Sequence, residues 1–292
     1  ATVHVVPNSF DCEATRKGRA LEWARRNVPC EKEYVLFVDE DSIISDIPPI
    51  PDADVVQFSE CPTRTESLFT YLAELFRMGF QIEQRAFSSM SIPLYAWGGG
   101  LAIRRDLEDR ITWDHETIIE DTVFVWKAAQ NGDFEFEAVP TKFYNQAPPT
   151  ISAMIQQRRR WISGAIADLQ LLPRRYRYLF RVRNIGWSLS PIAIVFALVA
   201  FTQGEVLFNS HFLRLSVLLT VFLYTWSILG VWYADESLST GISLLLLTPL
   251  ISILHSIGAL VGFAFETSEF ETTKKINPSD TPSVSVSQEH DD

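Results

Sequence analysis

The sequence is poor in cysteine, has no excess of positive charge and contains one long region almost without charge. Its three cysteines, Cys12, Cys30 and Cys61, form no C-x-x-C pair, which argues against a disulfide framework or a structural zinc site. The 36 acidic residues outnumber the 25 basic ones, and phosphate binding needs a basic face, so nucleic acid is excluded as the main partner. With 292 residues, 47% of them hydrophobic, the chain can bury a core, which excludes a disordered or collagen-like protein.

The region with little charge is the carboxyl-terminal third. Between residues 184 and 265 the only formally charged side chains are Glu205, Arg214, Asp235 and Glu236. They separate three uncharged runs, Ile185–Gly204, Leu215–Ala234 and Ser237–Phe265. A membrane-spanning helix needs about 20 apolar residues, so we predict about three transmembrane helices within residues 184–266. Buried helices of a large soluble core are the alternative, but they would need more polar chain around them.

Residues 1–150 alternate between strand and helix patterns. The expected strands are Val3–Val6, Tyr34–Val38, Val55–Phe58 and Leu101–Ile103. The expected helices are Thr15–Asn27, Glu66–Phe80 and Thr122–Asn131. The run Tyr34–Val38 is continuously apolar, which is typical of a buried parallel strand. This order predicts an α/β domain with a mostly parallel sheet.

Residues 151–183 join the two parts as a basic, amphipathic segment. One helix face carries Ile151, Ile155, Ile162, Ile166 and Leu169. Residues 156–183 contain eight arginines and one acid, a balance of +7 in a chain of net charge -11. We expect an interfacial helix here, and positive charge beside the first span predicts that the α/β domain is cytoplasmic. The acidic tail, residues 267–292, has little to bury and is expected to be disordered.

The sequence does not determine on which side of the membrane the tail lies. Three spans that start in the cytoplasm would leave the tail, with Lys274 and Lys275, on the other side of the membrane. Alternatively, one apolar run lies in the interface or re-enters, and the third run, interrupted by Pro249, is the natural candidate.

Acidic residues follow the expected strand Tyr34–Val38. Ligands of parallel sheets bind beyond the carboxyl ends of the strands, which places Asp39, Glu40 and Asp41 at the mouth of a site. Carboxylates suit Mg²⁺ or Mn²⁺ bridging a diphosphate. Taken alone, such a cluster is more often a set of turn residues.

Two further groups permit a functional and a structural interpretation. Glu120 and Asp121 precede a helix, where Asp121 is either an N-cap or a general base that takes a proton from an attacking hydroxyl. The run Gln157–Trp161 offers arginines for phosphate and a tryptophan for a sugar ring, but an interfacial anchor explains it equally well.

Three other features are ambiguous by themselves. Gly98, Gly99 and Gly100 permit close approach of a ligand but are more often a tight turn. Lys17 is an ordinary helix lysine unless the fold brings it near phosphate. His255 lies in the third apolar run, where a neutral histidine bonded to a neighbouring helix is the commoner explanation, and we assign it no role.

In their order along the chain, these pieces resemble the family 2 glycosyltransferases, the group that contains cellulose, chitin and hyaluronan synthases. The resemblance covers about Thr15–Trp161 and rests on a lysine before Ala-Leu, an Asp-x-Asp, a Glu-Asp and a Gln-x-x-Arg-Trp. The stretches closest to the egghead-like β-1,4-mannosyltransferase branch are Lys17–Leu21, Gly98–Ile103, Ile119–Thr122 and Gln156–Trp161. The resemblance implies a Rossmann-like domain of the glycosyltransferase A type, followed by an interfacial helix and transmembrane helices.

The resemblance also implies a role for each matching residue. Asp39 and Asp41 would hold Mg²⁺ or Mn²⁺ and the diphosphate of a nucleotide-sugar donor, assisted by Lys17. Asp121 would be the catalytic base. Gln157, Arg160 and Trp161 would close over the leaving diphosphate and the acceptor end. The residues expected on the acceptor side are Gly98, Gly99, Gly100, Glu120 and Trp161.

The implied activity is transfer of a hexose to a lipid-linked or glycan acceptor by a membrane-bound enzyme in contact with membrane lipids. One base and no evident covalent nucleophile imply inversion, so an α-linked donor would give a β-glycoside. A processive polysaccharide synthase and a non-catalytic membrane scaffold are the alternatives. Family members begin with a further strand and helix that hold much of the nucleotide base, so Ala1–Pro7 is expected to be a strand entered midway in a longer protein.

Overall fold

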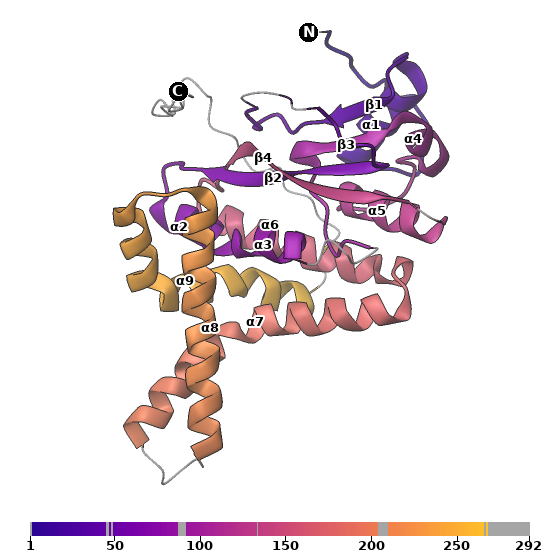
Figure 1. The fold of residues 1–292 in the computed structure, drawn as a ribbon. Coiled ribbons are helices and arrows are strands. Elements are labelled where there is room, and N and C mark those ends of the chain that lie inside the picture. The colour runs from indigo at the N-terminus through magenta and orange to yellow at the C-terminus, as the bar shows by residue number, and fades with distance from the viewer. Residues whose placement is uncertain are drawn as a thin grey trace.

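The computed structural model describes residues 2–44, 47, 49–86, 92–132, 134–203, 210–265 and 267. A sheet forms the upper layer in Figure 1, and α2, α3, α5 and α6 lie beneath it, with α7 to α9 beyond them. The strands are β1 Tyr34–Phe37, β2 Val55–Thr63, β3 Leu101–Arg104 and β4 Phe136–Gln146. The helices are α1 Arg16–Asn27, α2 Leu68–Arg77, α3 Gly79–Ala86, α4 Arg105–Ile111, α5 Glu120–Gln130, α6 Ile151–Ala167, α7 Arg174–Gln203, α8 Ser210–Ala234 and α9 Leu238–Ala264. Two short 3₁₀ helices are η1 Gly98–Gly100 and η2 Leu169–Leu171.

The sheet has the strand order β1-β3-β2-β4. Strand β3 is antiparallel to both β1 and β2, and β2 is parallel to β4. Three of the four strands therefore run in one direction, but only one of the three pairings is parallel. The α/β class is confirmed, and the sheet is mixed rather than mostly parallel. After β2 the chain passes through α2, α3 and η1, and β3 then pairs between β1 and β2. The antiparallel direction of β3 is set by this connection and not by the pattern of apolar residues.

The two amino-terminal strand predictions differ from the structure. Val3–Val6 forms no strand, and Val3 and Val5 are 88% and 82% exposed. β-Branched residues favour a strand only where a sheet face is available for packing, and none covers this segment. Strand β1 is half-buried along its length because it lies at the edge of the described sheet.

The remaining elements of the α/β domain follow the sequence closely, with two additions. The predicted helix Glu66–Phe80 begins two residues later, at Leu68 after the N-cap Ser67, and is divided between α2 and α3. The predicted helices at Thr15–Asn27 and Thr122–Asn131 are α1 and α5. We did not predict α4 or β4, and β4 contains Pro140 and buries only Val139 and Phe143.

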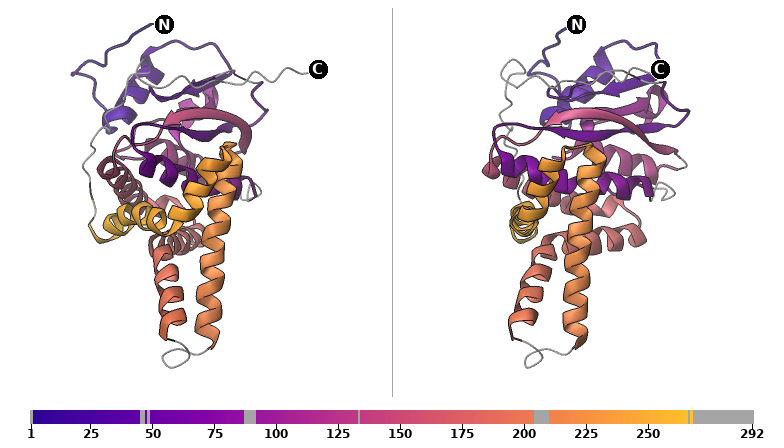
Figure 2. Two further views of the ribbon diagram at one scale, coloured as in Figure 1. Left: turned by 90° about the vertical axis from the view of Figure 1, so that its left-hand side faces the viewer. Right: turned by 60° about the vertical axis from the view of Figure 1, so that its left-hand side comes forward.

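Among the described residues, three helices are long and apolar enough to cross a membrane: Arg174–Val199, Ser210–Ala234 and Leu238–Ala264. The first begins before the expected Ile185 because the basic segment continues into the same helix as the apolar run. Helices α7 and α9 contain Pro191 and Pro249, and both are bent (Figures 1 and 2). The second half of α7 and the first half of α8 form a hairpin that points away from the sheet (Figure 2).

The apolar helices pack directly on the α/β domain. One buried cluster joins α2 and α6 to α7, α8 and α9, through residues that include Leu72, Met154, Ala193, Leu223 and Ile251. Helix α8 approaches α2 so closely that a Cβ on Gly230 would overlap the Leu75 carbonyl oxygen. Gly258 and Gly262 let α9 lie against α6 in the same way. The hydrophobic core is therefore shared across the expected boundaries at residues 150 and 184.

The ends of α9 lie against α2 and α6. Just before its start, Glu236 accepts a hydrogen bond from Tyr71 of α2, and Tyr233 at the end of α8 donates one of 3.0 Å to the backbone oxygen of Glu60. At its end, Arg159 Nε of α6 donates to the Phe265 oxygen at 3.2 Å. Hydrogen bonds therefore tie the start of α9 to α2 and its end to α6. The expected disordered tail lies almost entirely outside the described residues.

Candidate active site

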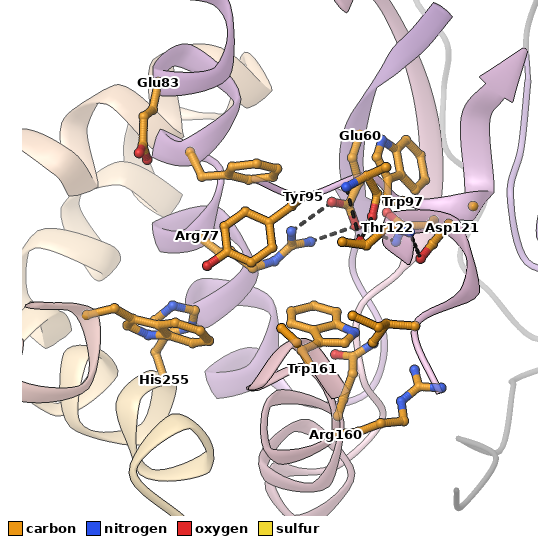
Figure 3. Close-up of a pocket in the computed structure, with 18 of the residues that line it drawn as sticks. Glu60, Arg77, Glu83, Tyr95, Trp97, Asp121, Thr122, Arg160, Trp161 and His255 are labelled. Atoms are coloured by element: carbon orange, nitrogen blue, oxygen red, sulfur yellow. Dashed lines mark hydrogen bonds and ion pairs between the residues drawn. The ribbon is translucent and has the colours of Figure 1, made fainter. Parts of the chain in front are cut away.

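A cavity of about 1240 Å³ opens beneath the sheet and extends into the apolar helices. Its polar end brings together almost all the site residues expected from sequence: Lys17, Asp39, Glu40, Asp41, Gly98, Glu120, Asp121, Gln157, Arg160 and Trp161. Gly99 and Gly100 do not line it, because they are buried against Trp97 and Phe143. Figure 3 shows Asp121 and Arg160 at one end of the pocket, Glu83 and His255 at the other, and Trp161 between them.

Lys17 lies close to two acids at the mouth of the cavity. Its Nζ is 2.5 Å from Asp39 Oδ1 and 3.4 Å from Glu120 Oε1. Burial lowers the pKa of Lys17, but Asp39, Glu120 and Asp121 raise it by more, so the ammonium is charged. The missing side chain of Gly98 leaves room for Nζ, since a Cβ there would overlap it. Lys17, ambiguous in the sequence, is thus a fixed positive charge beside the acids.

Asp121 is placed by the first turn of α5. The N-cap of this helix is Ile119, so the capping role that the sequence favours for Asp121 is wrong. Its Oδ1 accepts a hydrogen bond of 2.7 Å from the Thr122 backbone N–H. Burial, together with the neighbouring Glu120 carboxylate, raises the pKa of Asp121 to about 7. A carboxyl with this pKa can accept a proton near neutral pH.

Asp39 and Asp41 follow β1, as expected. Asp41 is 9% exposed, and its Oδ2 accepts a 3.3 Å hydrogen bond from the Gln146 backbone N–H. Within the described residues, no three His, Cys, Asp or Glu side chains gather as ligands for one metal ion. Mg²⁺ in phosphate-binding sites is held by one or two carboxylates plus substrate phosphates. The two acids on the same cavity fit an ion that a bound diphosphate would share.

Helix α6 presents its arginines in different directions. Arg158 is fully buried and ion-paired with Glu74, so it cannot anchor this helix at a membrane surface. Its Nη1 donates to Gln157 Oε1 at 2.6 Å, and its guanidinium lies 4.4 Å from the centre of the Trp161 ring. Arg160 points into the cavity, where burial lowers its pKa despite nearby acids. Helix α6 therefore places the guanidinium of Arg160 in the site, while that of Arg158 packs against Trp161.

A buried ion network, which we did not predict, supports this wall. Arg77 donates to Glu60 at 2.6 and 2.7 Å and to Glu74 at 2.7 Å, and its guanidinium lies 5.3 Å from the Trp161 ring centre. Burial raises the pKa of Glu74, but Arg158 and Arg77 lower it by more, so it stays ionised. A signal was present in the sequence, since Glu60 interrupts an apolar strand and Glu74 lies on an apolar helix face.

Comparison with known proteins agrees with this geometry. The model of the family described as "Glycosyl transferase family group 2" matches residues 34–260. The β-1,4-mannosyltransferase egh of Drosophila melanogaster is 23% identical over 220 residues, 66% of this chain and 48% of that protein. The β-1,4-mannosyltransferase bre-3 of Caenorhabditis briggsae is 22% identical over an alignment that covers 93% of this chain and 66% of that protein. The chain spans about half the length of the Drosophila relative.

Proposed function

Because this chain belongs to glycosyl transferase family group 2, we propose that it forms the active site of a membrane-anchored, inverting hexosyltransferase. The donor is a UDP- or GDP-linked sugar, the acceptor is lipid-linked or a glycan, and the product is a β-glycoside. The observation that carries this proposal is Asp121, a carboxyl with a pKa of about 7 that shares a cavity with Lys17, Asp39, Asp41 and Arg160. The names of the relatives favour mannose as the sugar.

In the proposed reaction, ionised Asp121 takes the proton from an acceptor hydroxyl. The hydroxyl oxygen attacks the anomeric carbon of the donor, the bond from that carbon to the diphosphate breaks, and the nucleoside diphosphate leaves with the electron pair. Lys17 and Arg160 place positive charge beside the departing diphosphate. Asp39 and Asp41 would hold Mg²⁺ or Mn²⁺, which supplies further charge neutralisation when bound. A single displacement inverts the configuration of an α-linked donor.

The membrane placement follows from the apolar helices. The exposed apolar side chains of the α7–α8 hairpin include Leu198, Phe201, Leu218 and Phe222. An apolar surface of this kind is suited to lipid, and it points away from the sheet (Figure 2). The arginines at the start of α7 favour a cytoplasmic α/β domain.

The experiment is nucleotide release from a panel of UDP- and GDP-sugars with Mn²⁺, using the full protein in membranes. We expect release with one donor, abolished by Asp121→Asn and by Asp41→Ala. Asp106→Asn is the matched control, since Asp106 is an exposed acid on α4 outside the cavity, and it should behave as wild type. A folded protein that releases nucleotide from no donor, with any candidate acceptor, would favour the scaffold. Products of many lengths would favour the processive synthase.

A further inference from the structure

The side chain of Asp168 joins the end of α6 to the segment that precedes α5, which we call the 115–119 segment. Its Oδ2 accepts a hydrogen bond of 2.7 Å from the Thr117 hydroxyl, and its Oδ1 lies 3.1 Å from His115 Nε2. The Thr117 oxygen in turn accepts a 3.2 Å hydrogen bond from the backbone N–H of Ile119, which is the N-cap of α5. Hydrogen bonds therefore run without a gap from α6 to the residue at which α5 begins.

The two helices joined in this way carry different parts of the proposed chemistry. Asp121 lies two residues after Ile119, in the first turn of α5. Arg160 and Trp161 lie about two turns before Asp168 on α6. Figure 3 shows Asp121 and Arg160 at the same end of the pocket. The position of the proposed base relative to Arg160 therefore depends on how the start of α5 is held against α6.

Close packing holds the 115–119 segment on α6 as well. A Cβ on Gly164 of α6 would lie 2.9 Å from the Ile118 side chain and 3.0 Å from that of Ile119. Ile119 is buried in the same apolar cluster as Ala165 of α6. Apolar packing is not directional, so it sets the separation of the segment from the helix. The hydrogen bonds to Asp168 fix where along α6 the segment lies.

The end of α6 does not itself require this side chain. The backbone of Asp168 ends the helix, because its N–H donates 3.1 Å to the Gly164 oxygen and its oxygen accepts 3.0 Å from the Leu171 N–H. Any residue supplies these two groups. A carboxylate is disfavoured at the negative end of a helix dipole, and Asp168 is only 6% exposed. Among the described residues its one ion-pair partner is His115, so local stability does not account for an acid at this position.

We propose that Asp168 is a positioning residue for the transfer reaction: through Thr117 and Ile119 it fixes the place of the Asp121 carboxyl opposite Arg160. The inference rests on the proposed function. Asp168, Thr117 and His115 do not line the cavity, so they touch neither donor nor acceptor. Their loss should therefore slow transfer and leave donor binding unchanged.

The first test compares two replacements of Asp168 at pH 8, where Asp121, with its pKa of about 7, is ionised. Asp168→Ala removes both oxygens, whereas Asp168→Asn keeps one that can accept from Thr117. Asp168→Ala should lower kcat at least 10-fold, while KM for the nucleotide sugar and the half-saturating Mn²⁺ concentration stay within about twofold of wild type. Asp168→Asn should keep most of the wild-type kcat.

The matched control is Asp54→Ala. The Asp54 carboxyl accepts a 2.9 Å hydrogen bond from the Glu135 backbone N–H, and it lies outside the cavity. Its loss should leave kcat at the wild-type value for the fraction of protein that is folded. An unchanged kcat in Asp168→Ala, or a fall that Asp54→Ala matches, would overturn the proposal.

A second pair of variants tests the link without touching Asp168. Thr117→Val removes the hydroxyl with little change of shape and should lower kcat at least fivefold. Thr117→Ser keeps the hydroxyl and should behave as wild type. Equal kcat in Thr117→Val and Thr117→Ser would overturn the proposed path through Thr117.

The pH profile distinguishes positioning from a general loss of structure. The charged groups that face Asp121 are Glu120, Lys17, Asp39 and Arg160, and none of them changes in these variants. A displaced 115–119 segment admits water to Asp121, and less burial lowers the pKa of a carboxyl. The midpoint of kcat/KM against pH should therefore fall by about half a pH unit or more in Asp168→Ala. A wild-type midpoint in that variant would overturn the proposal, since a smaller folded fraction alone does not move it.

Hydrogen exchange supplies a readout that does not depend on transfer. Peptides that cover residues 115–123 should exchange at least fivefold faster in Asp168→Ala and Thr117→Val than in wild type, while those that cover β3 stay unchanged. Unchanged exchange at residues 115–123 would overturn the proposal. Faster exchange in a protein that releases nucleotide from no donor would refute the proposed function and leave the link between α6 and the segment intact. Turnover at equal kcat in wild type and Asp168→Ala would refute the positioning role alone.

Discussion

Lys17 Nζ lies 2.5 Å from Asp39 Oδ1, so a helix lysine and the first acid after β1 form an ion pair at the mouth of the cavity. This pair occupies the place where a donor diphosphate and its cation are expected. Both side chains are about one-third exposed, so the pair can open when a more highly charged ligand arrives.

The first prediction assigns different roles to Lys17 and Asp39. Lys17→Ala removes a charge that faces phosphate, and we expect KM for the nucleotide sugar to rise at least 10-fold with little change in the half-saturating Mn²⁺ concentration. Asp39→Asn removes a cation ligand, and that concentration should rise at least 10-fold. Titrations of Mn²⁺ and donor against nucleotide release measure both effects. Identical responses of the two variants would contradict separate roles.

The second prediction concerns the pH dependence of transfer. Asp121 acts as a base only when ionised, and its pKa is raised to about 7. We expect kcat/KM to rise about tenfold per pH unit below pH 7 and to level off above it. Asp121→Asn should lower kcat by about 10²- to 10⁴-fold and remove this dependence. A flat profile in the wild type would argue against Asp121 as the base.

The same shift changes stability with pH. Because the pKa of Asp121 is higher in the folded protein than its ordinary value of 3.8, folding favours the protonated form. This contribution is complete below pH 3.8 and is lost as pH rises through 7. Asp121→Asn should therefore raise Tm relative to wild type by more at pH 8 than at pH 5. Thermal unfolding in one detergent at both pH values measures the difference, and equal shifts would contradict the raised pKa.

The third prediction addresses the buried pair of Glu74 and Arg158. Arg158→Met leaves Glu74 with one cation instead of two, and removing one partner of a buried pair costs about 3 to 5 kcal/mol. The double variant Glu74→Leu, Arg158→Met should lose less than the sum of the single variants. Arg110→Met, at an exposed surface pair, should cost under about 0.5 kcal/mol. Additive losses in a denaturation series would show that the pair is not coupled.

The fourth prediction concerns the side of the membrane on which α9 ends, which the sequence leaves open. The ends of α9 lie against α2 and α6, beneath the sheet, so Phe265 should face the same side of the membrane as α4. In a variant with serine at Cys12 and Cys30, we introduce Phe265→Cys or Arg110→Cys, both at exposed positions. A membrane-impermeant maleimide should label both in vesicles of one orientation and neither in the other. Labelling from opposite sides would mean that α9 crosses.

Much of the site could be predicted because its residues lie in short motifs on local elements with clear patterns. Asp39 follows strand β1, Asp121 lies in the first turn of α5, and Trp161 lies within α6. The sequence could not reveal which neighbours each side chain meets. Asp121 thus looked like a cap, and Arg158 looked like a surface anchor until its pairing with Glu74 was visible.

The errors in the fold have a related cause. The strand propensity of Val3–Val6 depends on a neighbouring strand, which the described residues do not provide. The direction of β3 depends on the path of the connection before it. The part of the cavity beyond Trp161 is bordered by α2, α3, α7, α8 and α9. Sequence patterns report on residues that are close together in the chain, so they do not predict that these helices meet.

The close contact of Gly230 with the Leu75 carbonyl limits which segments of this protein can be exchanged for those of another protein. The three helices that we propose to cross the bilayer also form one wall of the cavity, so they are not an interchangeable anchor. A chimera that joined residues 1–183 to the membrane helices of another enzyme would lose that wall and the fit of α8 on α2. We therefore expect relatives that use different acceptors to differ in α2 and α8 together, and to keep the residues at the donor end of the cavity unchanged.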